Sequence, residues 1–337
     1  MKDEQGLTTR DSMIKMFLQT KDAVISGEAL SQTLGLSRTA IWKQIKQLES
    51  YGFRFEATTR VGYRVVHVPD ELMQPLITPY LPANATFGHS VLWAPARAST
   101  NDDATQLART GAPTGVVITA GEQTGGRGRQ GRNWTSPAGG MWFSVIVRTP
   151  CALSQAAELT LLASVAVRRA LVACGSIDVE IKWPNDILVN GKKVCGILAQ
   201  MRTDAEQVDY AVIGIGINAN FANTQLPNDI LARATTLQTE LGHPIERPKL
   251  LADILSSLET LYTDLQTGAG GFHTVRDEWK DAAHTLNRKI QVKVGDDLLS
   301  GVATDVDEQG ILYLHGDDGQ IHRIHSGEVL FSAAEEV

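Results

Sequence analysis

Long apolar runs and cysteines are scarce in this sequence, and their scarcity excludes several classes of protein. No stretch of 18 or more apolar residues occurs among the 337 residues, so no segment is suited to crossing a membrane as a helix. The charged N-terminus has no apolar region after it, which argues against secretion. The three cysteines, Cys151, Cys174 and Cys195, are too few and too scattered for a disulfide framework or a zinc site. We therefore expect a cytoplasmic protein without a protein-bound metal.

Positive charge is scarce outside the first part of the chain. The net charge is -7, yet residues 1–66 hold ten lysines and arginines against seven acidic residues, whereas the remainder holds 21 against 31. Any contact with nucleic acid is therefore expected in this N-terminal head alone. The length allows two or three domains. The sequence patterns place them at 1–67, 85–285 and 286–337, with a linker at 68–84.

The head has the pattern of a helix-turn-helix. Three short helical repeats follow one another, with Ser26 and Ser37 as caps of the second and third helices and Gly35 in the turn between them. The apolar stripe of the third helix faces a small core. Its opposite face offers hydrogen-bond donors to DNA from Arg38, Thr39, Trp42, Lys43 and Lys46.

A hairpin completes the head, and a proline-rich linker follows it. Residues 53–56 and 63–66 show the alternating pattern of strands on both sides of a bend that contains Gly62. This pattern predicts the wing of a winged helix, with Arg60 at its tip. A helical domain that binds proteins is the alternative to DNA binding. The linker contains Pro69, Pro75, Pro79 and Pro82, a density that predicts an extended conformation.

The central part alternates strand and helix patterns without a repeat. Residues 116–119 and 212–217 are continuous apolar runs that predict buried strands, and residues 154–174 predict a long helix. Asn190-Gly191 between two apolar runs is a strong hairpin signal. Hairpins mixed with helices predict an α+β fold with a mixed sheet.

A glycine-rich stretch of arginines, residues 125–134, carries most of the predicted chemistry. Glycines let a backbone approach a ligand closely, and arginines suit planar capture of carboxylate or phosphate. Trp134 offers a flat surface on which adenine can stack. The stretch lacks the GK[ST] ending of a Walker A loop. A disordered RNA-binding tract is the alternative, which its position between two strand patterns disfavours.

Further polar groups stand at the ends of the predicted strands. Lys182 to Asp186 form one cluster, Lys193 follows the Asn-Gly turn, and Asn218 follows the strand at 212–217. Taken singly, each is also explained as an ordinary polar strand end.

Together these motifs resemble the bacterial biotin–protein ligases, specifically the bifunctional kind fused to a winged helix. The resemblance covers nearly the whole chain, and the glycine-arginine loop and the KWPND segment are its specific parts. In chain order the matching motifs are Ser99-Thr100-Asn101, Gln123, Gly126-Arg127-Gly128-Arg129, Lys182-Trp183-Pro184-Asn185-Asp186, Lys193 with Gly196-Ile197-Leu198, and Gly214-Ile215-Gly216-Ile217-Asn218.

The resemblance implies a central domain like the class II aminoacyl-tRNA synthetases and a two-step reaction. The biotin carboxylate attacks the α-phosphate of ATP to give biotinyl-5′-AMP, and a lysine of a biotin carboxyl carrier protein, that of acetyl-CoA carboxylase, then attacks the mixed anhydride. No covalent enzyme nucleophile is required, which agrees with a sequence that shows no Ser/His/Asp or Cys/His arrangement.

The resemblance also assigns roles to residues. Cations at Arg127, Arg129 and Lys193, with Mg²⁺ on the phosphates, would neutralise the charge that develops at the α-phosphate. Asp186 would orient or deprotonate the carrier lysine. The remaining positions implied to bind biotin or ATP are Ser99, Thr100, Asn101, Gln123, Gly126, Gly128, Trp134, Lys182 and Asn218.

The last 52 residues predict several short strands separated by Gly/Asp turns, a pattern typical of a small β-barrel, which is SH3-like in this family. His315, His322 and His325 have no second ligand cluster and do not predict a metal site.

Three functions therefore compete. The first is a ligase that also represses transcription of biotin synthesis genes, with biotinyl-5′-AMP as corepressor and a ligand-induced homodimer on operator DNA. The second is a biotin-sensing transcription factor without ligase turnover, and the third is a lipoate-type ligase on the same fold. We also expect the glycine-arginine loop to be mobile until ligand binds. Residues 219–227 contain no tryptophan where the family's adenylate-covering loop varies.

Overall fold

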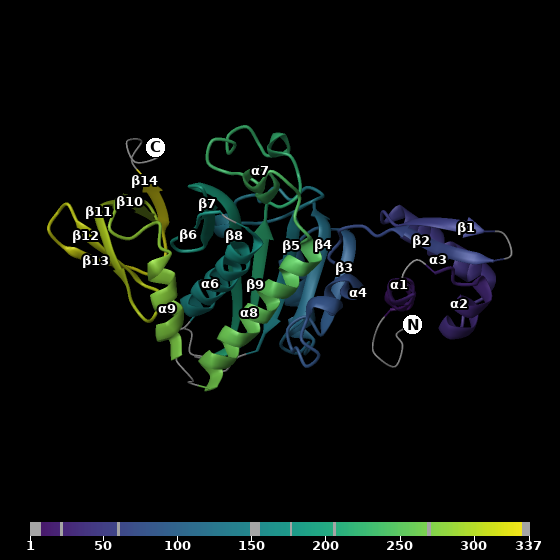
Figure 1. Cartoon of the computed structure of the whole chain (residues 1–337). Helices are drawn as coiled ribbons and strands as arrows, with labels where there is room; N and C mark the ends of the chain where they lie inside the picture. Colours follow the sequence, from purple (N-terminus) through teal and green to yellow (C-terminus); the bar gives the residue numbers. More distant parts are fainter. Residues whose placement is uncertain are drawn as a thin grey trace.

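Three bodies lie in a row in the computed structural model (Figure 1), with the head at one end, the large central sheet in the middle and a smaller sheet at the other end. The structure describes residues 8–20, 23–58, 61–148, 156–175, 177–204, 207–267 and 271–331. Within these ranges no helix is long and apolar enough to cross a membrane.

The head is the predicted winged helix-turn-helix. Ser26 Oγ accepts a hydrogen bond from Ala29 N, Ser37 Oγ accepts one from Ala40 N, and Gly35 ends the second helix with a left-handed φ of 64°. These caps confirm the predicted boundaries of the turn. The elements are α1 (Thr9–Gln19), α2 (Gly27–Leu34), α3 (Arg38–Ser50) and the antiparallel hairpin of β1 (Arg54–Thr58) and β2 (Gly62–His67).

The central body is built on a seven-stranded sheet of order β3-β4-β5-β9-β8-β7-β6. The β3–β4 pair is parallel and every other pair is antiparallel, which confirms the predicted mixed sheet. The strands are β3 (Ser90–Arg97), β4 (Val116–Gln123), β5 (Met141–Val147), β6 (Val179–Lys182), β7 (Asp186–Val189), β8 (Lys192–Asp204) and β9 (Gln207–Ile217).

Helices cover both faces of this sheet, which explains its continuous apolar strands. Neighbouring residues point to opposite faces, so Val117 packs into the main core while Ile118 packs with Ala104 and Ala108 of the helix on the other face. Figure 1 shows the two long helices α6 and α8 side by side over one face. The helices are α5 (Thr100–Arg109), α6 (Ala156–Cys174), α7 (Leu237–Leu241), α8 (Arg247–Thr267) and α9 (Gly271–Asp281).

The segment predicted to be an extended linker is folded and packed, so that prediction of its conformation was wrong. It forms α4 (Gln74–Ile77) and a 3-10 helix, η1 (Thr78–Tyr80), with Leu72, Met73 and Ile77 fully buried. The prolines at 75 and 79 occupy first-turn positions, where a missing N–H costs nothing. Two of the four prolines therefore mark the starts of short helices.

The C-terminal body is a five-stranded antiparallel sheet of order β13-β12-β11-β10-β14. This confirms the predicted run of short strands with Gly/Asp turns. The strands are β10 (Lys289–Val294), β11 (Asp297–Val306), β12 (Leu312–Gly316), β13 (Ile321–Ile324) and β14 (Glu328–Phe331).

Candidate functional site

A tight hairpin brings Asp186 and Lys193 together. Asn190 and Gly191, with φ of 50° and 76°, form the turn that joins β7 to β8, as the sequence predicts. Lys193 Nζ lies 2.7 Å from Asp186 Oδ1 and 5.0 Å from the centre of the Trp134 ring. The hairpin therefore places one cation and one carboxylate at the foot of the glycine-arginine loop.

The Trp134 ring packs against two glycines of adjacent strands. Gly196 of β8 and Gly216 of β9 are direct partners in the sheet, and a Cβ on either would come within 3 Å of the indole. Its Nε1 is buried and has no hydrogen-bond partner within the described ranges. A buried donor without a partner is costly, so this N–H is available to a ligand atom.

The arginines of the loop point in three directions. Arg127 forms an ion pair with Asp102 on α5, and Arg132 forms one with Glu328 at the start of β14. Between them, Arg129 Nη1 donates to Asn185 Oδ1 at 3.3 Å and to the Gly327 carbonyl at 3.2 Å. Burial lowers the pKa of Arg129, and the nearby Asp186 carboxylate opposes that shift. The loop therefore joins the central body to the C-terminal sheet across the site.

The Arg132–Glu328 pair gives a testable pH dependence of the loop. Arg132 lowers the pKa of Glu328, so the pair persists below the usual carboxyl range and is lost only as the pH falls through the lowered value. At neutral pH we expect a Glu328→Gln substitution to raise tryptic cleavage of residues 125–134 about fivefold, since such a pair contributes ~1 kcal/mol. Glu308→Gln, on the same body but away from the loop, is the control. Equal cleavage of both variants would contradict a role of this ion pair in holding the loop. Amide exchange of residues 125–134 at neutral and acid pH tests whether the loop opens as the pH falls.

A buried polar network surrounds the start of α5. Gln123 Oε1 accepts from Thr100 N at 2.8 Å and from Thr100 Oγ1 at 3.1 Å, while Gln123 Nε2 donates to Ser136 Oγ at 3.0 Å. Asn101 Nδ2 donates to the Leu198 carbonyl. Ser99, which begins the predicted triplet, caps α5. The resemblance grouped Ser99, Thr100, Asn101 and Gln123, and the structure joins the last three in one network, while Ser99 caps the helix.

Small residues make room for this network. A Cβ on Gly214 would lie 2.0 Å from Asn101 Oδ1, and a Cβ on Gly126 would lie 2.5 Å from the Trp134 carbonyl. Gly128, in contrast, has ordinary clearance, with Arg132 O 3.7 Å from a Cβ built there. The glycines at 126 and 214 are therefore required by packing around the site.

Two predicted site residues have their side chains directed elsewhere. Asn218 Nδ2 donates to the Thr235 carbonyl, and residues 233–235 bond to the backbone of Lys193, so Asn218 holds the segment beside that lysine. Lys182 Nζ lies 4.8 Å from the ring centre of Phe331 on β14. Both residues are therefore placed to position neighbouring parts of the site.

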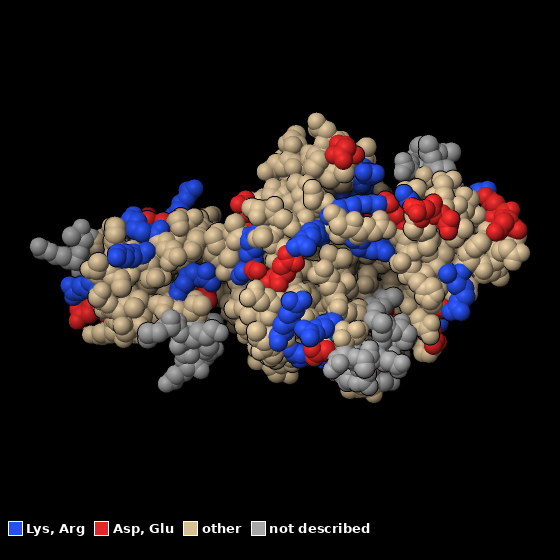
Figure 2. Space-filling view, turned by 180° about the vertical axis from the view of Figure 1, so that it is seen from behind, with Lys and Arg blue, Asp and Glu red and all other residues tan. Residues whose placement is uncertain are grey.

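The proposed DNA face is exposed as predicted. Arg38, Thr39, Trp42, Lys43 and Lys46 are all exposed on α3. Arg38 lies 3.6 Å from Glu28, and Lys46 Nζ lies 2.6 Å from Glu49. In Figure 2, which views the molecule from behind, the coloured lysines and arginines are spread among acidic side chains without forming one continuous basic field on that face. The predicted wing-tip Arg60 lies outside the described residues.

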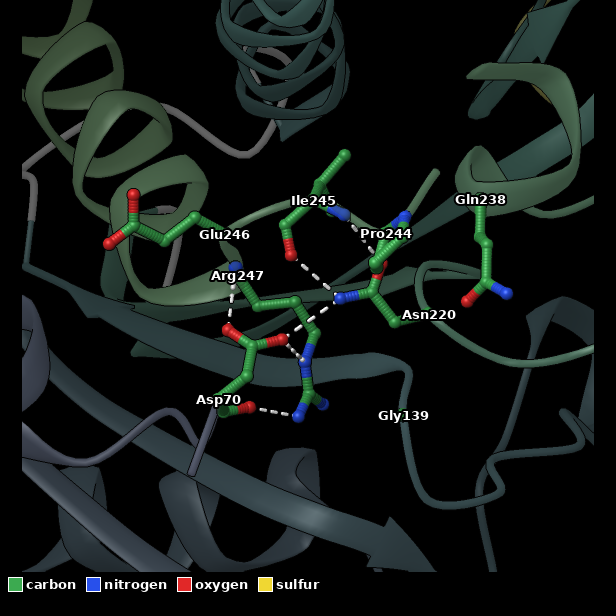
Figure 3. Close-up of a pocket in the computed structure, with 8 residues that line it drawn as sticks. All are labelled: Asp70, Gly139, Asn220, Gln238, Pro244, Ile245, Glu246 and Arg247. Atoms are coloured by element: carbon green, nitrogen blue, oxygen red, sulfur yellow. Dashed lines mark hydrogen bonds and ion pairs between the residues drawn. The ribbon is translucent and has the colours of Figure 1, made fainter. Parts of the chain in front are cut away.

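A buried arginine ties the linker to the segment that leads into β5 (Figure 3). Arg247 Nε lies 2.7 Å from Asp70 Oδ2, and its Nη1 donates to the Gly140 carbonyl at 2.7 Å. Asn220, two residues after Asn218, donates to the same Asp70 carboxylate at 2.9 Å. The Arg247 guanidinium is fully engaged by protein groups. The pocket that these residues line is therefore a structural junction.

Sequence reasoning missed Ser136, Ser144, Glu328 and Arg247. Ser144 had a usable signal, because it is the one polar residue in the buried run Met141–Val147. The contacts of Glu328 and Arg247 join residues more than 100 positions apart and left no local pattern.

Comparisons with known proteins cover all three bodies. The chain matches the family models "Biotin/lipoate A/B protein ligase family" over residues 93–218, "HTH domain" over 9–64 and "Biotin protein ligase C terminal domain" over 285–332. These matches follow the order of the head, the central body and the C-terminal sheet.

Relatives match over nearly their full length. The chain is 36% identical over 323 residues to "Bifunctional ligase/repressor BirA" of Bacillus subtilis (strain 168), covering 96% of this chain and 98% of that protein. It is 29% identical over 313 residues to the protein of that name from Escherichia coli (strain K12), covering 92% and 94%. A solved biotin protein ligase from Aquifex aeolicus in complex with biotin and ATP superposes with a TM-score of 0.61 at 27% identity, covering 72% of this chain and 97% of that one.

Proposed function

Since this chain belongs to the family of bifunctional biotin–protein ligases and repressors, we propose how its residues divide the two activities. The chain is an ATP-dependent biotin ligase and a DNA-binding repressor. The assignment of the ligase site rests on the ion pair of Lys193 with Asp186, next to Asn185, which binds Arg129. Trp134 contacts Lys193 and Ser136, and Ser136 joins it to the Thr100–Gln123 network.

Thr100 and Gln123 recognise the ureido ring of biotin. The Thr100 proton and the Thr100 N–H are both directed at Gln123 Oε1, so the hydroxyl oxygen has a lone pair to offer a ligand. Gln123 Nε2 has a second proton besides the one given to Ser136. One acceptor beside one donor is the complement of a cyclic urea, and the dithiolane ring of lipoate has neither group. This favours biotin as the substrate.

Cations of the loop and hairpin promote the first step. The biotin carboxylate attacks the α-phosphate of ATP, and pyrophosphate leaves. Arg129, Arg127 and Lys193 reduce the repulsion between the two anions and stabilise the charge that builds on the α-phosphate. Mg²⁺ bound to the phosphates of ATP would add to this neutralisation of charge. Trp134 positions Lys193 through its ring and offers adenine a flat surface.

Asp186 takes part in the second step. Its carboxylate stands beside Lys193, the hairpin cation assigned to the first step. There it accepts a hydrogen bond from the incoming carrier lysine and orients the amine for attack on the biotinyl carbonyl. The acceptor is the biotin carboxyl carrier protein of acetyl-CoA carboxylase, in line with relatives named biotin–[acetyl-CoA-carboxylase] ligase.

The remaining assignments concern architecture and regulation. We assign the central sheet to the class II synthetase-like folds and the five-stranded sheet to the SH3-like barrels. Biotinyl-5′-AMP serves as corepressor, and two ligand-bound copies bind a palindromic operator through their α3 helices.

One reaction tests the ligase assignment directly. The protein is incubated with biotin, ATP, Mg²⁺ and carrier protein, and both proteins are weighed by mass spectrometry. We expect biotinylated carrier and enzyme-bound biotinyl-5′-AMP, and no modification when lipoate replaces biotin. Adenylate without transfer would instead support a sensor without turnover, and modification by lipoate would support the third alternative.

A charge on α3 tests the repressor assignment. We expect Lys43→Ala to weaken binding to DNA from upstream of biotin synthesis genes and to reduce the slope of log affinity against log salt by about 1, while biotinylation is unchanged. Lys249→Ala, which removes a lysine of α8 paired with Asp253, is the matched control. An unchanged salt slope in Lys43→Ala would show that this lysine contacts no phosphate.

A further inference from the structure

A fully buried hydroxyl lies directly behind the biotin-recognition residues. Ser144 of β5 is 0% exposed, and its Oγ lies 2.8 Å from Thr100 Oγ1 and 2.6 Å from Asn101 Oδ1. All its neighbours in Met141–Val147 are apolar. A buried hydroxyl stabilises such a strand poorly unless its hydrogen bonds are specific.

The direction of these hydrogen bonds is fixed by Asn101. Its Nδ2 donates to the Leu198 carbonyl at 3.3 Å and to Gln200 Oε1 at 3.2 Å, so its Oδ1 is turned toward Ser144 and can only accept. The single Ser144 proton is therefore directed at Asn101 or shared with Thr100. The Thr100 proton is directed at Gln123 Oε1, so Thr100 Oγ1 is the acceptor in its contact with Ser144 Oγ.

We propose that Ser144 is a specificity-determining positioning residue for biotin. It keeps the Thr100 hydroxyl in one orientation, with its proton inside the network and a lone pair toward the ligand. That oxygen then accepts from a ureido N–H and rejects ligands that need a donor at this point. The inference rests on the proposed binding of biotin at Thr100 and Gln123, and it adds a residue that need not touch the substrate.

Two serine substitutions separate positioning from burial. We expect Ser144→Ala to raise the KM for biotin about fivefold to tenfold, the value of one neutral hydrogen bond, while kcat and the KM for ATP change less than about twofold. Ser164→Ala is the control, because Ser164 is also 0% exposed and donates within α6 to the Thr160 carbonyl. Ser144→Cys, with a weaker donor of similar shape, serves if Ser144→Ala does not fold, and an intermediate KM is expected.

A double-mutant cycle decides whether Ser144 acts through Thr100. In a Thr100→Val background we expect Ser144→Ala to raise the KM for biotin less than about twofold, because the hydroxyl it orients is gone. Additive effects would overturn the proposal, as would an unchanged KM for biotin in Ser144→Ala. If the wild-type protein and Ser164→Ala bind no biotin, the proposed function itself fails, and that result is distinguishable from failure of the role of Ser144.

Discussion

A Lys193→Gln protein forms biotinyl-5′-AMP about a hundredfold to a thousandfold more slowly than the wild type, the usual effect of removing one preorganised electrostatic group from a transition state. Lys193 is held by Asp186 at 2.7 Å and by the face of Trp134, so its charge is fixed before substrate arrives. Glutamine keeps most of the length and loses the charge. Pyrophosphate release in a single turnover, with biotin and ATP saturating, measures the step.

The neighbouring lysine provides the control for this result. Lys192 is exposed and points to the opposite side of β8, because successive side chains of a strand alternate. Lys192→Gln is therefore expected to form adenylate at the wild-type rate. Equal rates in both variants would show that the hairpin supplies no charge to the first step, and the assignment of Lys193 would be abandoned.

A Gly214→Ala substitution is expected to weaken biotin binding more than a glycine-to-alanine substitution elsewhere in the site. The new Cβ would lie 2.0 Å from Asn101 Oδ1, so the network behind Thr100 must shift. We expect an increase in the KM for biotin of about a hundredfold and a loss of about 1–3 kcal/mol in the free energy of unfolding, as for overpacked interiors. Steady-state kinetics and denaturant unfolding measure the two effects.

A second glycine distinguishes this effect from general strain. A Cβ on Gly216 would meet Trp134 Nε1 at 2.6 Å, so Gly216→Ala is expected to raise the KM for ATP more than that for biotin. Gly27→Ala, in the head with its nearest neighbour 4.0 Å away, is expected to change neither constant. The same kinetic profile in the 214 and 216 variants would refute separate subsites for biotin and nucleotide.

Local signals in the sequence were sufficient for most of the fold. The serine caps, Gly35 and the Asn190-Gly191 turn act through bonds within a few residues, so each was predictable and each is confirmed. Unbroken apolar runs indicated buried strands, and β4 and β9 are buried on both faces. The prediction of an extended linker was wrong because proline density alone does not distinguish an extended chain from the first turns of short helices.

The candidate site was predictable as a set of residues but not as a geometry. The resemblance to the biotin–protein ligases implied that Thr100, Gln123 and Lys193 belong together, yet their partners came from elsewhere in the chain. Ser144 reaches Thr100 from another strand, and Glu328 reaches Arg132 across 196 positions. Such contacts depend on the packing of whole bodies, which no local pattern encodes.

The ion pair between Arg132 and Glu328 has an evolutionary consequence. One partner lies in the central body and the other on β14, so selection acting on the loop also acts on the C-terminal sheet. In a lineage that replaces Arg132, Glu328 no longer has this partner. A lineage with an acidic residue at 132 and a basic residue at 328 would keep the ion pair. Chimeras that combine a central body from one species with a C-terminal sheet from another should therefore work best when these two positions come from the same parent.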